Sequence, residues 1–124
     1  MILKIDKDFK KHERKAVMRY LRMLIFRLDW FCYYFDIRPV YFEVHKTTKG
    51  LHIRGHTDVE LGARELIILQ LVLGSDWLRE VRNLFRVQGG MEDWNLLFNV
   101  KYKMQDGKYI NAMRESFLMS FVVD

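Results

Sequence analysis

Three of the four histidines lie within residues 40–56, where their spacing gives them a shared surface. Apolar and polar side chains alternate through this stretch, which predicts a β-hairpin with one polar face. A loop at residues 47–50 fits the pattern, because Gly50 can adopt a left-handed backbone conformation. The resulting register sets His45 opposite His52, Glu43 opposite Arg54, and Tyr41 opposite His56.

The facing histidines have the chemistry of a metal site. Across the hairpin, the β-carbons of His45 and His52 are expected roughly 5 Å apart, and Glu43 stands two residues along the same strand. Two imidazoles and a carboxylate suit a divalent metal such as zinc, manganese or magnesium. His56 fits less well, since four residues of strand place it about 13 Å from His52. The alternative is that the histidines only form a polar surface.

The charge of the chain favours an anionic partner. Lys and Arg number 21 against 16 Asp and Glu, which gives a formal charge of +5 and a pI near 9.4. We therefore expect DNA or RNA to bind, with phosphate groups meeting the polar face of a sheet. The residues expected there come from the hairpin, a first strand and a later strand: Lys4, His52, Arg54, His56, Lys101 and Lys103.

The loop residues Thr48-Lys49-Gly50 and the following Leu51-His52 resemble the glycine-x-histidine hairpin motif of archaeo-eukaryotic primases. That resemblance implies a catalytic core on an RNA-recognition-like sheet, with His52 contacting nucleotide phosphates and Glu43 facing a metal. The paired acidic ligands of the family are not visible, because Glu43 is followed by His45 two residues later. In size and motif the chain is also similar to orphan proteins of archaeal viruses and plasmids.

The periodicity of the remaining sequence predicts an α+β domain. We expect a strand at residues 1–5, a long helix at 6–35, helices at 57–73 and 75–87, and a strand at 94–103. In the helix at 75–87, Leu78 and Phe85 are expected to point inward and Arg79 outward. A closing helix is expected within 111–117. This order is that of a ferredoxin-like (βαββαβ) sandwich, an antiparallel sheet with one open polar face.

The long helix offers two further surfaces. One is a basic stripe in its first half, which is either a phosphate-contacting face or an ordinary solvated helix end: Lys7, Lys10, Lys11, Arg14, Lys15, Arg19 and Arg22. The other is an apolar set that is either buried under the C-terminal segment or a homodimer interface: Met18, Met23, Phe26, Trp30, Tyr33 and Tyr34.

Length and cysteine content complete the expectations. The 124 residues are expected to form a single domain, and Cys32 stands alone in an apolar run, which predicts a reducing, cytoplasmic location. The charged residues within the apolar stretch of the long helix argue against a membrane span. The sequence thus favours a small nucleic-acid-associated protein. The alternatives are a metal-dependent nuclease or nucleotidyl-transfer enzyme using Glu43, His45 and His52, and a structural homodimer without catalysis.

Overall fold

The computed structural model describes residues 1–10, 13–35, 40–97, 102–111 and 115–123. The chain is an α+β protein, as predicted. The strands are β1 (Ile2–Asp8), β2 (Val40–Thr47), β3 (Gly50–His56), β4 (Tyr102–Gln105), β5 (Lys108–Asn111) and β6 (Glu115–Val123). The helices are α1 (Arg14–Phe35), α2 (Ala63–Val72) and α3 (Trp77–Gln88).

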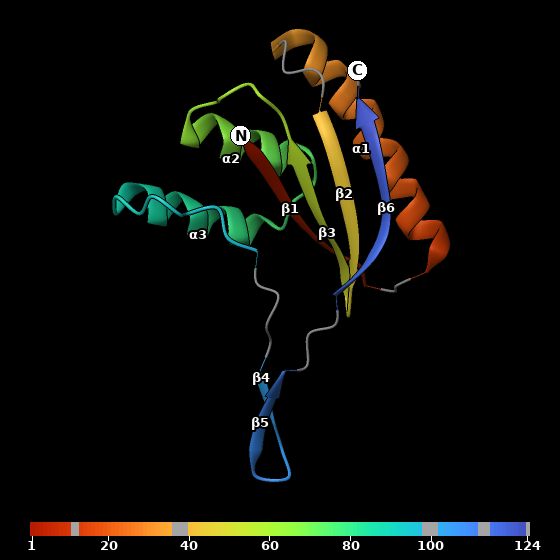
Figure 1. The fold of residues 1–124 in the computed structure, drawn as a ribbon, viewed down its shortest axis with the longest axis vertical. Helices are drawn as coiled ribbons and strands as arrows, with labels where there is room; N and C mark the ends of the chain where they lie inside the picture. The colour runs from red at the N-terminus through yellow and green to blue at the C-terminus, as the bar shows by residue number, and fades with distance from the viewer. Residues whose placement is uncertain (11–12, 36–39, 98–101, 112–114, 124) are drawn as a thin grey trace.

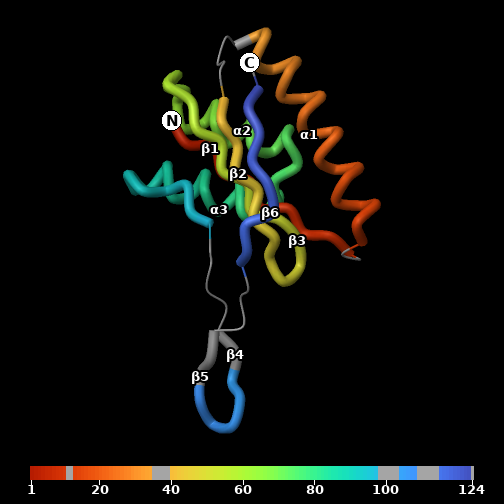
Figure 2. Tube along the Cα trace, turned by 45° about the vertical axis from the view of Figure 1, so that its right-hand side comes forward, coloured from red at the N-terminus to blue at the C-terminus, as the bar shows by residue number. Residues whose placement is uncertain are grey.

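Four strands form one antiparallel sheet in the order β1-β3-β2-β6 (Figure 1). Its centre is the predicted hairpin, and all three predicted polar pairs are confirmed in the register. β4 and β5 form a separate two-stranded hairpin, which lies apart from the sheet in both Figure 1 and Figure 2. Its turn places Asp106 and Gly107 at positive φ, which is the backbone of a tight hairpin turn.

One face of the sheet is apolar and carries α1 and α2, whereas none of the described helices covers the other face (Figures 1 and 2). Alternation along each strand explains this division: Ile5, Phe42 and Ile53 point into the core and are fully buried. From α1, residues such as Leu24 and Leu28 complete that core at three- and four-residue spacing. The long helix and the polar face of the sheet therefore agree with the sequence prediction, except that the helix begins at Arg14 and residues 6–8, predicted to be its start, belong to β1.

The position of the last strand differs from a ferredoxin-like sandwich, in which that strand pairs with the first. Here β6 pairs with β2, at the opposite edge of the sheet. The outer edge of β1 is occupied by side chains of α2 and of the turn after it: Gln70 accepts from the Lys4 amide at 2.8 Å, and Ser75 accepts from the Asp6 amide at 3.1 Å. A strand cannot pair there, because the backbone groups are already bonded.

Two predicted elements are wrong in whole or in part, and one is inverted. Of the strand predicted at 94–103, residues 94–97 form none, because Asn95 turns toward β1 and bonds to its backbone; residues 98–101 lie outside the described part, and 102–103 belong to β4. The closing segment forms β5 and β6 instead of a helix within 111–117, of which residues 112–114 lie outside the described part. In α3, Arg79 is buried at 5% exposure and Phe85 is 66% exposed, the reverse of the prediction. The polar face of α3 packs against the polar edge of β1, which explains the inversion.

Candidate functional site

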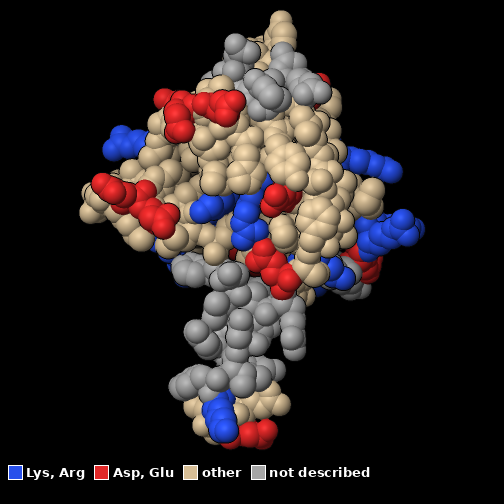
Figure 3. Space-filling model, in the orientation of Figure 1, with Lys and Arg blue, Asp and Glu red and all other residues tan. Residues whose placement is uncertain are grey.

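The open face of the sheet carries a cluster of ionisable side chains, seen at the centre of Figure 3 as blue and red atoms side by side. We call it the sheet-face cluster. It consists of Asp6 from β1, Glu43 and His45 from β2, His52 and Arg54 from β3, and Glu115 from β6.

Glu115 is the centre of this cluster. Its carboxylate accepts from Arg54 Nη1 at 2.8 Å, and it lies 3.3 Å from His52 Nδ1 and 3.6 Å from His45 Nδ1. The other nitrogen of His52 faces Asp6 at 3.6 Å, so this buried ring lies between two carboxylates. Glu115 was missed by sequence reasoning, because its segment was expected to be helical.

The pKa values of Asp6 and Glu115 are shifted in opposite directions by burial and ion pairing. Burial raises the pKa of Asp6 above its ordinary value, and the attraction of His52 opposes this only in part. Burial also acts to raise the pKa of Glu115, but the hydrogen bonds and charges of Arg54 and His52 outweigh it and lower that pKa. Glu115 is therefore held as the carboxylate of an ion pair.

The predicted metal site is not supported by this geometry. Among the residues that the structure describes, no three His, Cys, Asp or Glu side chains are placed to hold a metal ion. Glu43 and His45 contact each other at 3.7 Å, but His52 turns its nitrogens to Asp6 and Glu115. The physical reason is that β6 brings Glu115 between the two histidines, where it binds Arg54.

Four of the six predicted phosphate contacts, Lys4, His52, Arg54 and His56, lie on the open face of the sheet, but burial and pairing limit their access to an anion. His52 is buried and Arg54 is already paired, while Lys4 and His56 are only half-buried on the same face. Burial lowers the pKa of Lys4. Lys103 belongs to the separate hairpin of β4, so it does not share the sheet face, and Lys101 lies outside the described residues. With three carboxylates and a single arginine, the sheet-face cluster is a poor anion site.

A second group of cations lies at the end of the sheet where β1 stops, α1 starts and β2 turns into β3. We call it the basic end. The Phe9 amide donates to the Lys49 carbonyl at 3.0 Å, and Arg14 and Lys46 line one groove beside β6. In Figure 3, blue atoms lie along the lower right border of the molecule, on the side of α1. Its members are Lys7, Lys10, Arg14, Lys15, Lys46 and Lys49.

The cations of the basic end differ from Arg54 of the sheet-face cluster in that they have no carboxylate partner among the described residues. Within the described ranges none of its cations forms an ion pair, and all except the half-buried Lys7 are exposed. Lys7 instead places its ammonium 5.9 Å from the ring centre of Phe9 and 5.5 Å from that of Tyr20. Asp8 and Glu13 are the nearby carboxylates in the sequence.

A buried polar network, centred on Arg79, covers the edge of β1. Its guanidinium donates to the carbonyls of Lys4 at 2.9 Å and Leu96 at 2.8 Å, and to Asn95 Oδ1 at 2.8 Å. It also pairs with Glu80, which is fully buried and accepts from Gln70, Ser75 and Asn83. Burial lowers the pKa of Arg79, and Glu80 opposes this. The side chains of this network bond to the backbone of β1, to the backbone of Leu96 or to one another, so the network has a structural role.

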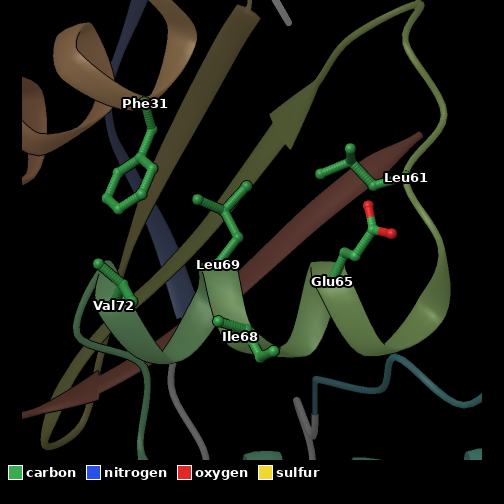
Figure 4. Close-up of a pocket in the computed structure, with 6 residues that line it drawn as sticks. All are labelled: Phe31, Leu61, Glu65, Ile68, Leu69 and Val72. Atoms are coloured by element: carbon green, nitrogen blue, oxygen red, sulfur yellow. The ribbon is translucent and has the colours of Figure 1, made fainter. Parts of the chain in front are cut away.

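The pocket shown in Figure 4 lies between α1 and α2 and has a volume of about 190 Å³. Phe31 of α1 faces Leu69 and Val72 of α2 across it, and Glu65 stands near Leu61 at the other end. One carboxylate among apolar side chains provides neither a nucleophile with a base nor a metal ligand set. The pocket therefore indicates no reaction.

Comparisons with known proteins returned no match: no family model, no curated protein and no solved structure is similar to this chain. In the part of the chain that the structure describes, no helix has the length and apolar character needed to cross a membrane.

Proposed function

We propose that this protein binds nucleic acid through its basic end, by contacts to the phosphate backbone. The observation that carries the proposal is the difference in pairing between the two charged surfaces. Cations of the basic end have no carboxylate partner among the described residues, whereas Arg54 on the sheet face is bound to Glu115. Unpaired, exposed cations release counterions from a phosphate backbone at little cost, which is the main source of sequence-independent affinity.

The shape of the basic end suits a backbone better than a base. Its cations come from three segments that meet at one end of the sheet, and the two rings that Lys7 contacts there, Phe9 and Tyr20, are at least half-buried. Among the described residues, the nearest exposed ring is that of Phe117, which packs against His45 on the open face. Base stacking on single strands uses several exposed rings in succession. Binding is therefore expected to be tolerant of sequence. The buried thiol of Cys32 agrees with a cytoplasmic location for this function.

Fluorescence anisotropy over a salt series tests the proposal, with duplex DNA, single-stranded DNA and RNA as separate probes. The double variant Arg14→Glu/Lys46→Glu removes two exposed cations that line one groove. Its plot of log K against log salt should be shallower by about 2 than that of the wild type, because each phosphate contact contributes about 0.9 on duplex DNA.

The matched control is Arg64→Glu/Arg82→Glu, which makes the same change of charge at exposed positions of α2 and α3. The control should keep the wild-type slope. Equal losses in both double variants would show only an effect of net charge, and would contradict binding at the basic end. No binding of wild type to any probe would refute the proposal.

A metal-dependent reaction is not favoured by the geometry. The ligand set that it requires is Glu43, His45 and His52, and the described positions of these side chains do not converge on one point.

A further inference from the structure

The two edges of the main sheet differ in how far their outward backbone groups are hydrogen-bonded. On β1, groups of α2, of α3 and of the segments that follow them bond to the outward backbone groups of Ile2, Lys4 and Asp6. On β6, the described residues provide a partner on the β2 side only. An uncovered edge is a template for another strand, and proteins normally protect it with charges, prolines or a covering element.

β6 has little of that protection. Its sequence ESFLMSFVV contains no proline, and Glu115 at its start is its one charged residue. Phe117, Leu118 and Val122 are 61%, 44% and 53% exposed. A register irregularity between Val44 and His45 divides the strand, and residues 119–123 beyond it pair regularly with β2. These five residues are an intact, apolar edge.

The apolar surface continues from this edge onto α1. A groove along β6 is lined by Val122 and Val123 together with Arg22, Ile25, Phe26 and Asp29 of the helix. Phe26 is 75% exposed and Ile25 is 41% exposed. A partner that extends the sheet would therefore also contact an apolar helix surface. Arg22 lies on one side of the centre of that surface and Asp29 on the other.

We propose that a second copy of this chain binds this edge, pairing its β6 with the first across a two-fold axis near Phe121. Two identical strands related by such an axis run antiparallel, so the contact is self-complementary and closes after two copies. The two α1 helices then lie antiparallel on the same side of the joined sheet. About a centre between Ile25 and Phe26, Arg22 of one copy faces Asp29 of the other. This charge match favours the same chain over an unrelated partner.

The size of the surface reaches the lower limit for a specific dimer. About an axis near Phe121, residues 119–123 of the two strands overlap over about 17 Å, whereas the antiparallel α1 helices can overlap over about 30 Å. With each layer about 10 Å thick, the contact covers about 500 Å² per copy, or about 1,000 Å² in total, which is the lower limit for a specific interface.

The test is the mass of the protein in solution over a concentration series, measured by sedimentation or light scattering. Wild type should be a dimer, and both Phe26→Glu and Val122→Lys should raise the dissociation constant about tenfold or more. Both positions are exposed, so the fold of the single chain should remain intact. The matched control Phe85→Glu changes a side chain of similar exposure, 66%, on α3 and should stay dimeric.

Two further variants locate the axis. Phe26→Cys should form a disulfide with its copy under mild oxidation, whereas Phe85→Cys should not. Arg22→Asp and Asp29→Arg should each weaken the dimer, and the two together should restore it. A wild type that is monomeric at all concentrations would overturn the proposal. So would a dimer that survives both Phe26→Glu and Val122→Lys.

Discussion

Substitution of Arg79 by methionine tests whether the buried polar network stabilises the edge of β1. The change preserves much of the aliphatic volume but removes the guanidinium from a site that is 5% exposed. Glu80, which is fully buried, then keeps its charge without a cation, and the carbonyls of Lys4 and Leu96 lose their donors. Breaking one side of a buried ion pair costs about 3–5 kcal/mol. That is a large part of the stability of an ordinary domain.

Urea denaturation followed by circular dichroism measures this loss. With a slope of about 1.5 kcal/mol per molar urea, a loss of about 4 kcal/mol lowers the midpoint by between 2 and 3 M. Arg82→Met is the matched control, since Arg82 is exposed on the same helix, and it should change stability by less than about 0.5 kcal/mol. In the Arg79 variant, amide exchange of Lys4 and Asp6 should also accelerate. A loss below about 1 kcal/mol would refute the view that this network holds the edge of β1.

Three other predictions concern the sheet. Glu115→Gln should make the free energy of unfolding less sensitive to acid. The lowered pKa of Glu115 stabilises the fold above the ordinary carboxyl pKa, and this stabilisation is lost as the pH falls through the pKa of the folded state. Denaturation at a series of pH values measures the difference between the variant and the wild type. Asp6→Asn should have the opposite sign, since a raised folded pKa makes this carboxylate costly at neutral pH; the variant should be more stable than wild type at pH 7, and the difference should vanish in acid. Gly50→Ala should destabilise by about 3 kcal/mol or more, because its β-carbon would collide with the carbonyl oxygen of Lys7 on the paired strand; Gly62→Ala, where the nearest atom is at 3.7 Å, is the control in the same denaturation assay.

The central hairpin and the long helix could be predicted because each carries a regular period. Strict alternation on both sides of Gly50 determines which residues face each other, and the observed pairs His45–His52 and Glu43–Arg54 follow from it. In α1, three- and four-residue spacing identifies Leu24, Leu28 and other core positions. The core was therefore largely readable from the sequence.

The orientation of α3 could not be read in the same way. Periodicity shows that a helix has a polar and an apolar face, but the inward face depends on what it packs against. Here the neighbour is the bare edge of β1, so Arg79, Glu80 and Asn83 are buried. A signal was present in Gln70, the polar residue within the apolar run 66–72 of α2, which reaches the same network. The outer position of β6 has the same origin, because that network occupies the other edge.

The sheet-face cluster was only half predictable for a related reason. Residues of the hairpin are close in sequence, so their register places them, but Glu115 is 63 positions from His52 and comes from a segment without clear alternation. Its arrival pairs Arg54 and brings a carboxylate into contact with both histidines. The surface predicted to bind phosphate or metal is thereby internally paired, whereas the described cations of the basic end form no ion pair.

The most direct measurement of the central proposal is a titration of isotope-labelled protein with a short DNA duplex, followed by amide chemical shifts. Binding at the basic end predicts shifts concentrated around Lys10, Arg14, Lys46 and Lys49, which disappear as salt is raised. The amides of Arg54 and His52 should move little. Shifts centred on the sheet-face cluster, or spread evenly over the molecule, would contradict the proposed function.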